Sequence, residues 1–137
     1  ELIDIVLDAK PHIWGHNIET VERLFRQVRP QSRFETTTSV LSYVARSGVV
    51  STKSGMMVGL GEKQDEVLKV MDDLLEHGCD VMTIGQYLQP TRNHLEVKEW
   101  IHPNVFSFYR EQGMKKGFKI VESGPLVRSS YHAEKHL

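Results

Sequence analysis

The stretch KSGMMVGLGEKQDEVLKVMDDLLEHGCDVMTIGQ, residues 53–86, decides the predicted fold. It opens with a strand-like run over residues 53–58 and closes with a second one over residues 81–86. Between them, apolar side chains recur at the period of an amphipathic helix, at Val67, Val70, Met71, Leu74 and Leu75. A strand, a helix and a strand of these lengths predict one βαβ unit of a parallel sheet.

The ends of this helix are marked by charge and by glycine. Glu62, Asp65 and Glu66 crowd its start, where carboxylates interact favourably with the helix dipole. His77 lies in the last turn, and Gly78 suits the left-handed conformation that ends many helices. The sequence therefore predicts a helix over residues 63–77.

The same alternation continues outward on both sides. Further strands are expected at residues 12–14 and 118–121, and further helices at residues 19–28, 35–47 and 103–117. The pattern predicts an α/β fold with a parallel sheet. Four strands are too few for an eight-stranded β/α barrel, which needs about 250 residues. Because Glu1 is not an initiator methionine, we expect a fragment of a partial barrel, although an open sheet also fits.

Composition limits the function classes. The chain has 137 residues, 39% of them hydrophobic, and a formal net charge of -1, so we expect one domain without a strong field for nucleic acid or an anionic membrane. No apolar run approaches the roughly 18 residues of a membrane span. The single cysteine, Cys79, cannot form an internal disulfide or supply a cluster's ligand set, and we expect it to be a small buried side chain.

Polar residues follow the first two expected strands. Asn17 and Glu19 could hold a ribose, whereas Asn17 or Thr20 could instead cap the next helix. Residues 54–62 contain three glycines that would let the backbone approach a ligand. Because they lack a Lys and Ser/Thr pair and carry acidic residues, they argue against a phosphate loop. An uncharged or cationic cofactor part fits this turn, as does a turn without a ligand.

Two long segments lack a clear pattern. Residues 88–101 form a long loop, of a kind that is often functional. Residues 123–137 form a tail rich in hydroxyl, guanidinium and imidazole groups, which suits either ligation or plain solvation. His132 and His136 have the spacing of a zinc helix but lack further ligands. The aromatic side chains near the last helix are expected to pack, at Trp100, Phe106, Phe108 and Tyr109.

Five segments together resemble the carboxyl-terminal half of the lipoyl synthase family of radical S-adenosylmethionine (SAM) enzymes. They are GHNIETV at 15–21, TKSG at 52–55, GLGE at 59–62, GQYLQP at 85–90 and SGPLVRSSY at 123–131. The resemblance divides the chain into half of a barrel over residues 1–122 and a ligating tail over residues 123–137. Two departures stand out: both cysteine triads of the family are absent, and TTT at 36–38 replaces the usual Ser-Leu pair after a polar residue.

The resemblance implies a six-stranded partial β/α barrel with two [4Fe-4S] clusters and SAM. SAM would supply a 5′-deoxyadenosyl radical, and the auxiliary cluster would donate two sulfur atoms to C6 and C8 of a protein-bound octanoyl group. Ser129 is implied as a ligand of the auxiliary cluster, with Ser130 as the alternate. The implied cofactor-binding residues are Asn17, Glu19, Lys53, Gly55, Gly59, Gly61, Gln86 and Arg92.

The resemblance also implies partners and a compartment. The substrates would be octanoylated carrier proteins, namely the glycine cleavage H protein and the E2 subunits of 2-oxoacid dehydrogenases, and ferredoxin or flavodoxin would supply electrons. Neither nucleic acid nor a membrane is expected as a partner. The location would be the bacterial cytoplasm, or the mitochondrial or plastid matrix in eukaryotes. The alternative is a non-catalytic half-barrel that docks on a cluster-bearing chain or on the carrier protein.

Overall fold

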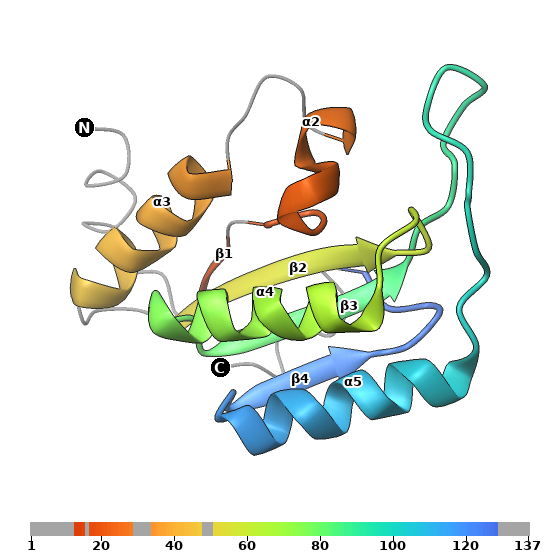
Figure 1. Cartoon of the computed structure of the whole chain (residues 1–137). Helices are drawn as coiled ribbons and strands as arrows, with labels where there is room; N and C mark the ends of the chain where they lie inside the picture. Colours follow the sequence, from red (N-terminus) through yellow and green to blue (C-terminus); the bar gives the residue numbers. More distant parts are fainter. Residues whose placement is uncertain (1–12, 16, 29–33, 48–50, 129–137) are drawn as a thin grey trace.

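The computed structural model describes residues 13–15, 17–28, 34–47 and 51–128. Within them four parallel strands form one sheet in the order β1-β2-β3-β4 (Figure 1). The strands are β1 Ile13–Gly15, β2 Ser51–Val58, β3 Val81–Gln86 and β4 Ile120–Ser123. Because each strand pairs with the next one along the chain, the sheet has the sequential order found in part of a β/α barrel. The α/β parallel architecture is confirmed.

The helices connect the strands. They are the short 3₁₀ helix η1 Glu22–Leu24, α2 Phe25–Val28, α3 Phe34–Ser47, α4 Gln64–Glu76 and α5 Pro103–Lys116. The predictions for α3, α4 and α5 are confirmed to within one residue at each end. Gly78 takes the expected left-handed conformation after α4, with φ of 87°.

The predicted helix over residues 19–28 is wrong in its first part. The backbone N–H of Glu19 donates to the Gly55 carbonyl (3.0 Å), and the Met57 N–H donates to the Glu19 carbonyl (2.9 Å). Both backbone groups of Glu19 are therefore bonded to β2, and the chain follows the sheet beyond β1 before it coils at Glu22. The capping alternative is also wrong, because the N-cap of η1 is Val21, which makes no side-chain cap bond.

The strand boundaries differ from the sequence predictions by one or two residues. β1 is described from residue 13, since the expected first residue, residue 12, lies outside the described residues, and β2 begins two residues earlier than expected. β4 begins two residues later, because the Phe118 N–H still donates to the Gly113 carbonyl in the turn that ends α5 (3.2 Å). The ladder with β3 can start only at Ile120, which pairs with Val81.

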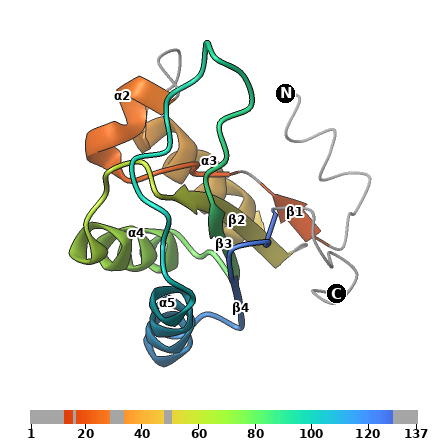
Figure 2. The same ribbon diagram turned by 90° about the vertical axis from the view of Figure 1, so that its right-hand side faces the viewer.

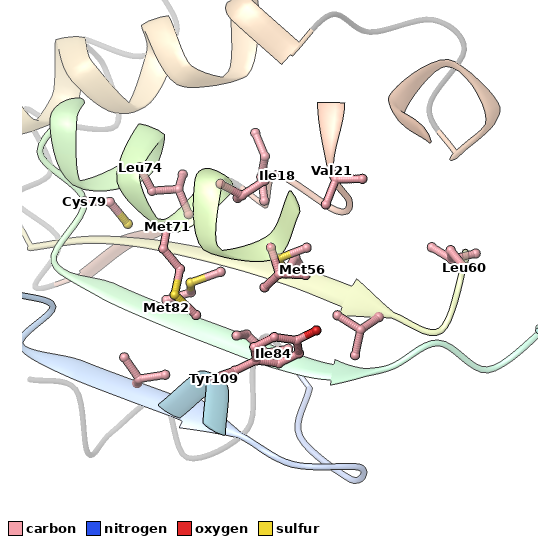
Figure 3. Close-up of a cluster of buried hydrophobic side chains, with 14 of the residues drawn as sticks. Ile18, Val21, Met56, Leu60, Met71, Leu74, Cys79, Met82, Ile84 and Tyr109 are labelled. Atoms are coloured by element: carbon pink, nitrogen blue, oxygen red, sulfur yellow. The ribbon is translucent and has the colours of Figure 1, made fainter. Parts of the chain in front are cut away.

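One face of the sheet packs against helices. α4 and α5 lie along this face, as the two views in Figures 1 and 2 show. Apolar side chains of α4 pack against those of β2 and β3, where Met71 lies next to Met82 (Figure 3). Tyr109 of α5 lies over Ile84 of β3 in the same view. Since strand side chains alternate between faces, the intervening residues Gly55, Met57, Thr83 and Gly85 face the other side of the sheet.

The expectations for single side chains are largely confirmed. Cys79 is buried between α4 and the sheet, as predicted, and Phe106 and Tyr109 are buried in the core. The expectation for Trp100 is wrong, because 69% of this side chain is exposed. It lies near the end of the loop between β3 and α5.

Candidate functional site

A pocket of about 200 Å³ opens on the face of the sheet that α4 and α5 leave free. Its floor is made of residues that alternate away from the helices, Gly55, Met57, Thr83 and Gly85. Two of these four have no side chain, so the sheet itself leaves the space for a ligand. The remaining walls are Asn17, Glu19, Met56, Gln86, Leu88, Val127 and Arg128.

Asn17 and Glu19 reach this pocket from the segment after β1. The Asn17 Oδ1 accepts a hydrogen bond from the Gly55 N–H (3.1 Å), and the Ser54 Oγ accepts one from the Ile18 N–H (3.0 Å). These bonds tie the segment to β2 where β1 has ended. Glu19 has a φ of 73°, a left-handed conformation that is costly for a residue with a Cβ. Such strain, held by two backbone bonds to β2, is typical of functional sites.

The glycine-rich turn after β2 is organised by Glu62. Its carboxylate accepts hydrogen bonds from the N–H groups of Gly59 (3.0 Å) and Leu60 (2.9 Å), although the residue is only 8% exposed. Gly59 and Gly61 have φ of 100° and 105°, which other residues rarely adopt. A Cβ on Gly59 would also overlap the Gln86 amide nitrogen. The acidic residue and the glycines thus build the turn, and neither glycine is among the described residues that line the first pocket.

Gln86 lines the pocket, but its amide is bonded to backbone. The Nε2 group donates to the carbonyls of Tyr87 (3.1 Å) and Glu99 (3.0 Å), and Oε1 accepts from the Ile101 N–H (2.9 Å). Gln86 therefore fastens the end of the loop over residues 87–102 to the sheet. Gly59 contributes to the same fastening, because its carbonyl accepts from the N–H groups of Lys98 (2.8 Å) and Glu99 (3.2 Å).

A second pocket of about 500 Å³ adjoins the first beneath this loop. Glu19, Met57 and Leu88 belong to both pockets. The remaining lining of the second pocket mixes polar and apolar side chains, from Gln27, Tyr87, Pro90, Asn93, His94 and Leu95. The Tyr87 hydroxyl donates to the Leu95 carbonyl (2.7 Å), which holds the loop above the pocket. The two pockets together offer an extended site at the carboxyl ends of β2 and β3.

The other predicted site residues lie apart from the first pocket. Lys53 is 5% exposed on the pocket face of β2, and burial lowers the pKa of its ammonium group, while the Glu122 carboxylate on the same face acts in the opposite direction. Arg92 is exposed near the tip of the loop and lines neither pocket. The predictions for Ser129, Ser130, His132 and His136 lie outside the described residues.

Sequence reasoning missed several residues that line the pocket. Met57, Thr83, Gly85 and Leu88 were passed over, as were Val127 and Arg128. The strand residues carried a usable signal, since every second residue of β2 and β3 must face away from the helices. Val127 and Arg128 lie in the tail and the SGPLVRSSY motif that the sequence pointed to, but their approach to β3 depends on how the chain turns after β4.

The described residues do not offer a cluster its ligands. Among them, no group of three or more His, Cys, Asp or Glu side chains could hold a metal ion. Cys79 lies among apolar side chains on the helix face, and burial raises the pKa of its thiol to about 12. The thiolate that would bind iron is thus disfavoured there. The first pocket differs from such a site, because an acidic side chain, Glu19, and a basic one, Arg128, both line it.

The parts of the chain that the structure describes hold no helix with the length and apolar character of a membrane span. No family model matches the chain. In a comparison with solved structures, it is similar to a putative phosphonomutase from Burkholderia cenocepacia J2315, with a TM-score of 0.56 and 12% identity over 97% of this chain and 54% of that one. At this identity the likeness concerns the fold alone.

Curated proteins give a much closer match. The chain is 56% identical over all 137 residues to a lipoyl synthase of Parabacteroides distasonis, 53% identical to one of Treponema denticola and 50% identical to one of Porphyromonas gingivalis. It covers 48%, 47% and 49% of their respective lengths. This chain therefore belongs to the lipoyl synthase family and spans about half the length of the relatives that it matches.

Proposed function

We propose that the chain is the carboxyl-terminal half of a lipoyl synthase whose complete form inserts two sulfur atoms into a protein-bound octanoyl group. Identity of 50–56% over every residue of the chain supports this activity. The sequential parallel sheet is consistent with the proposed six-stranded radical SAM barrel. Within this half, residues 1–122 would belong to the barrel and residues 123–137 would form a ligating tail.

The single observation that carries the proposal in this chain is the placement of Glu19. Its strained backbone is held by β2, and its side chain lines both pockets. SAM has a cationic sulfonium, an ammonium and a carboxylate, so a site for it needs charges of both signs. Glu19 and Arg128 provide these charges at one pocket. A carboxylate at this position would also disfavour a nucleotide phosphate.

The chain's own residues would then hold and orient SAM. When bound and reduced, this cofactor supplies the radical that removes hydrogen from the octanoyl chain. Asn17 and Glu19 would contact its polar groups, and Gly55 would let it lie close to β2. Gly59, Gly61 and Gln86 would shape the turn and the loop around it. Lys53 and Arg92 are also proposed as cofactor-binding residues, although neither lines the two pockets.

Other features of the proposal come from the family. Ser129, with Ser130 as the alternate, would ligate the auxiliary [4Fe-4S] cluster, and the second cluster would need residues outside this chain. The partners would be octanoylated H protein or E2 subunits and a ferredoxin or flavodoxin. The bacterial relatives favour a cytoplasmic location. The non-catalytic alternative is not favoured, because these relatives carry the enzyme's name.

The test uses the full-length protein that contains these residues, reconstituted without oxygen. We expect Glu19→Gln to weaken SAM binding about tenfold in equilibrium dialysis, since hydrogen bonds to charged groups contribute about 1.5–3 kcal/mol. Glu22→Gln is the matched control, because Glu22 is exposed on η1 and lines neither pocket. Equal affinity in both variants would contradict the role of Glu19.

Ser129→Ala tests the ligand separately. This variant should still form 5′-deoxyadenosine but should lose the lipoyl product, measured by mass spectrometry of the carrier protein. Full retention of that product would remove Ser129 from the cluster site. A wild-type protein that cleaves no SAM would refute the proposed activity as a whole.

A further inference from the structure

The chain folds back onto β3 after β4. The Ser123 hydroxyl donates to the Phe106 carbonyl (2.8 Å), and the Gly124 N–H donates to the Ile84 carbonyl (3.1 Å). The Val127 N–H then donates to the Gly124 carbonyl (3.2 Å), which closes a turn over residues 124–127. These bonds return the backbone to the carboxyl end of β3, on the face that carries the pocket.

Gly85 is the residue that this turn meets. A Cβ built on Gly85 would overlap the Val127 carbonyl oxygen, and it would lie 3.2 Å from the Val127 carbonyl carbon and 3.3 Å from the Arg128 Nη1. The obstructing atom is backbone, so a side-chain rotation cannot relieve the overlap. The φ of Gly85 is not in the left-handed region, so this glycine is required for space and not for its backbone conformation.

The close approach has a consequence for the pocket. Val127 and Arg128 form one of its walls, and Gly85 forms part of the floor beside them. Arg128 supplies a positive charge to this pocket, which the Glu19 carboxylate on the segment after β1 also lines. A larger residue at position 85 would lift this wall off the floor and move the guanidinium group with it.

We propose that Gly85 is a positioning residue that seats the turn over residues 124–127 against β3 and thereby places Val127 and Arg128 in the wall of the SAM pocket. The identity of the ligand rests on the proposed function. The contact between Gly85 and the turn over residues 124–127, which we call the seat, rests on described residues alone.

The experiment compares wild type with Gly85→Ala in the full-length protein. Hydrogen–deuterium exchange of the segment over residues 122–128 reports the seat, because the N–H groups of Gly124 and Val127 are bonded there. We expect exchange to accelerate about tenfold and the dissociation constant for SAM to rise about tenfold, since overpacking of this kind must displace backbone.

Gly124→Ala is the matched control. It makes the same substitution in the same turn, but its Cβ would meet only the Val127 side chain, at an ordinary 3.6 Å. We expect this variant to exchange and to bind SAM as wild type does. Unchanged exchange in Gly85→Ala, or an equal effect of both alanine variants, would overturn the seat.

Faster exchange with unchanged SAM affinity would overturn the assignment of this wall to the SAM pocket. Failure of wild type to bind SAM would refute the proposed function, while the exchange data would still decide the seat. If Gly85→Ala does not fold, exchange in wild type with and without SAM decides the wall: slower exchange over residues 122–128 with SAM supports it, and no change overturns it.

Discussion

At the scale of single residues, a buried carboxylate organises the turn between β2 and α4. Glu62 accepts hydrogen bonds from two backbone N–H groups of this turn, which contains the left-handed glycines Gly59 and Gly61. Charge-assisted bonds of this kind are about twice as strong as neutral ones. Glu62 therefore acts on the ligand site through the backbone that it holds.

Glu62→Gln should lower the free energy of unfolding by about 1–3 kcal/mol, because the amide keeps one acceptor and loses the charge. Urea denaturation measures this change. Asp65→Asn is the control, since Asp65 is exposed in the first turn of α4 and its loss should cost less than about 1 kcal/mol. Equal losses in the two variants would show that the buried bonds contribute little.

A second carboxylate makes stability depend on pH. Arg23 binds Glu66 through two hydrogen bonds (2.8 and 2.9 Å), and this contact, with the Lys63 N–H, lowers the pKa of Glu66 from 4.5 to about 2. Because the folded pKa is lowered, the stabilisation is complete above about pH 4.5 and is lost as the pH falls through about 2. The contact is partly exposed, so its contribution is small.

Arg23→Gln should therefore be less stable than wild type near neutral pH, and the difference should shrink as the pH falls from about 5 toward about 2. Thermal unfolding of both proteins across this range measures the difference. Lys69→Gln, which removes the exposed pair with Asp73 on α4, is the comparison. A difference between Arg23→Gln and wild type that stays constant down to pH 2 would contradict the assignment.

At the scale of elements, the loop over residues 87–102, between β3 and α5, crosses the carboxyl ends of β2 and β3 and is anchored there by hydrogen bonds. Gln86, Tyr87 and Gly59 bind it at several points, so a segment without regular structure is still held in one place. In Figure 1 it rises beyond the ends of the strands before it returns to α5. Its anchoring decides the shape of the second pocket.

Gln86→Met keeps the side-chain volume but removes three hydrogen bonds, so we expect a loss of about 2–4 kcal/mol of unfolding free energy and faster amide exchange over residues 95–101. Gln89→Met is the matched control, because the exposed Gln89 bonds only to the His94 carbonyl. Faster amide exchange in β2 instead of the loop would show that Gln86 stabilises the sheet and not the loop over residues 87–102.

At the scale of the whole molecule, the described residues form a pocket at the sheet but hold no group of three or more His, Cys, Asp or Glu side chains that could bind a metal ion. The chain also spans about half the length of its relatives. A binding surface for SAM and the iron that reacts with it would thus come from different parts of one protein. This division predicts how the 137 residues behave by themselves.

The isolated 137-residue chain, reconstituted with iron and sulfide, should hold less than one cluster per chain and form no 5′-deoxyadenosine. Iron analysis and chromatography of the product measure both. Cys79→Ala should change neither value, because the thiol is buried and burial raises its pKa to about 12. A full cluster lost on this substitution would show that Cys79 is a ligand.

The family and the fold class could both be predicted from the sequence, but for different reasons. The period of Val67, Val70 and Met71 predicts α4 because burial of one helix face leaves a 3.6-residue pattern. The five spaced motifs identified the family, which the curated relatives confirm. Local sequence signals were weaker where tertiary hydrogen bonds determine the backbone conformation. Glu19 is an example, because β2 bonds both its N–H and its carbonyl and so holds its left-handed conformation.

The sequence by itself therefore determined the order of strands and helices, the glycine-rich turn and the family, since these depend on periodicity and on short local motifs. Only the tertiary structure decided that Asn17 and Glu19 meet Gly55, that Gln86 fastens a loop, and that Val127 and Arg128 close the pocket over Gly85. The physical reason is that these contacts join residues 13 or more positions apart and follow from how the sheet and its loops pack, which no local pattern encodes.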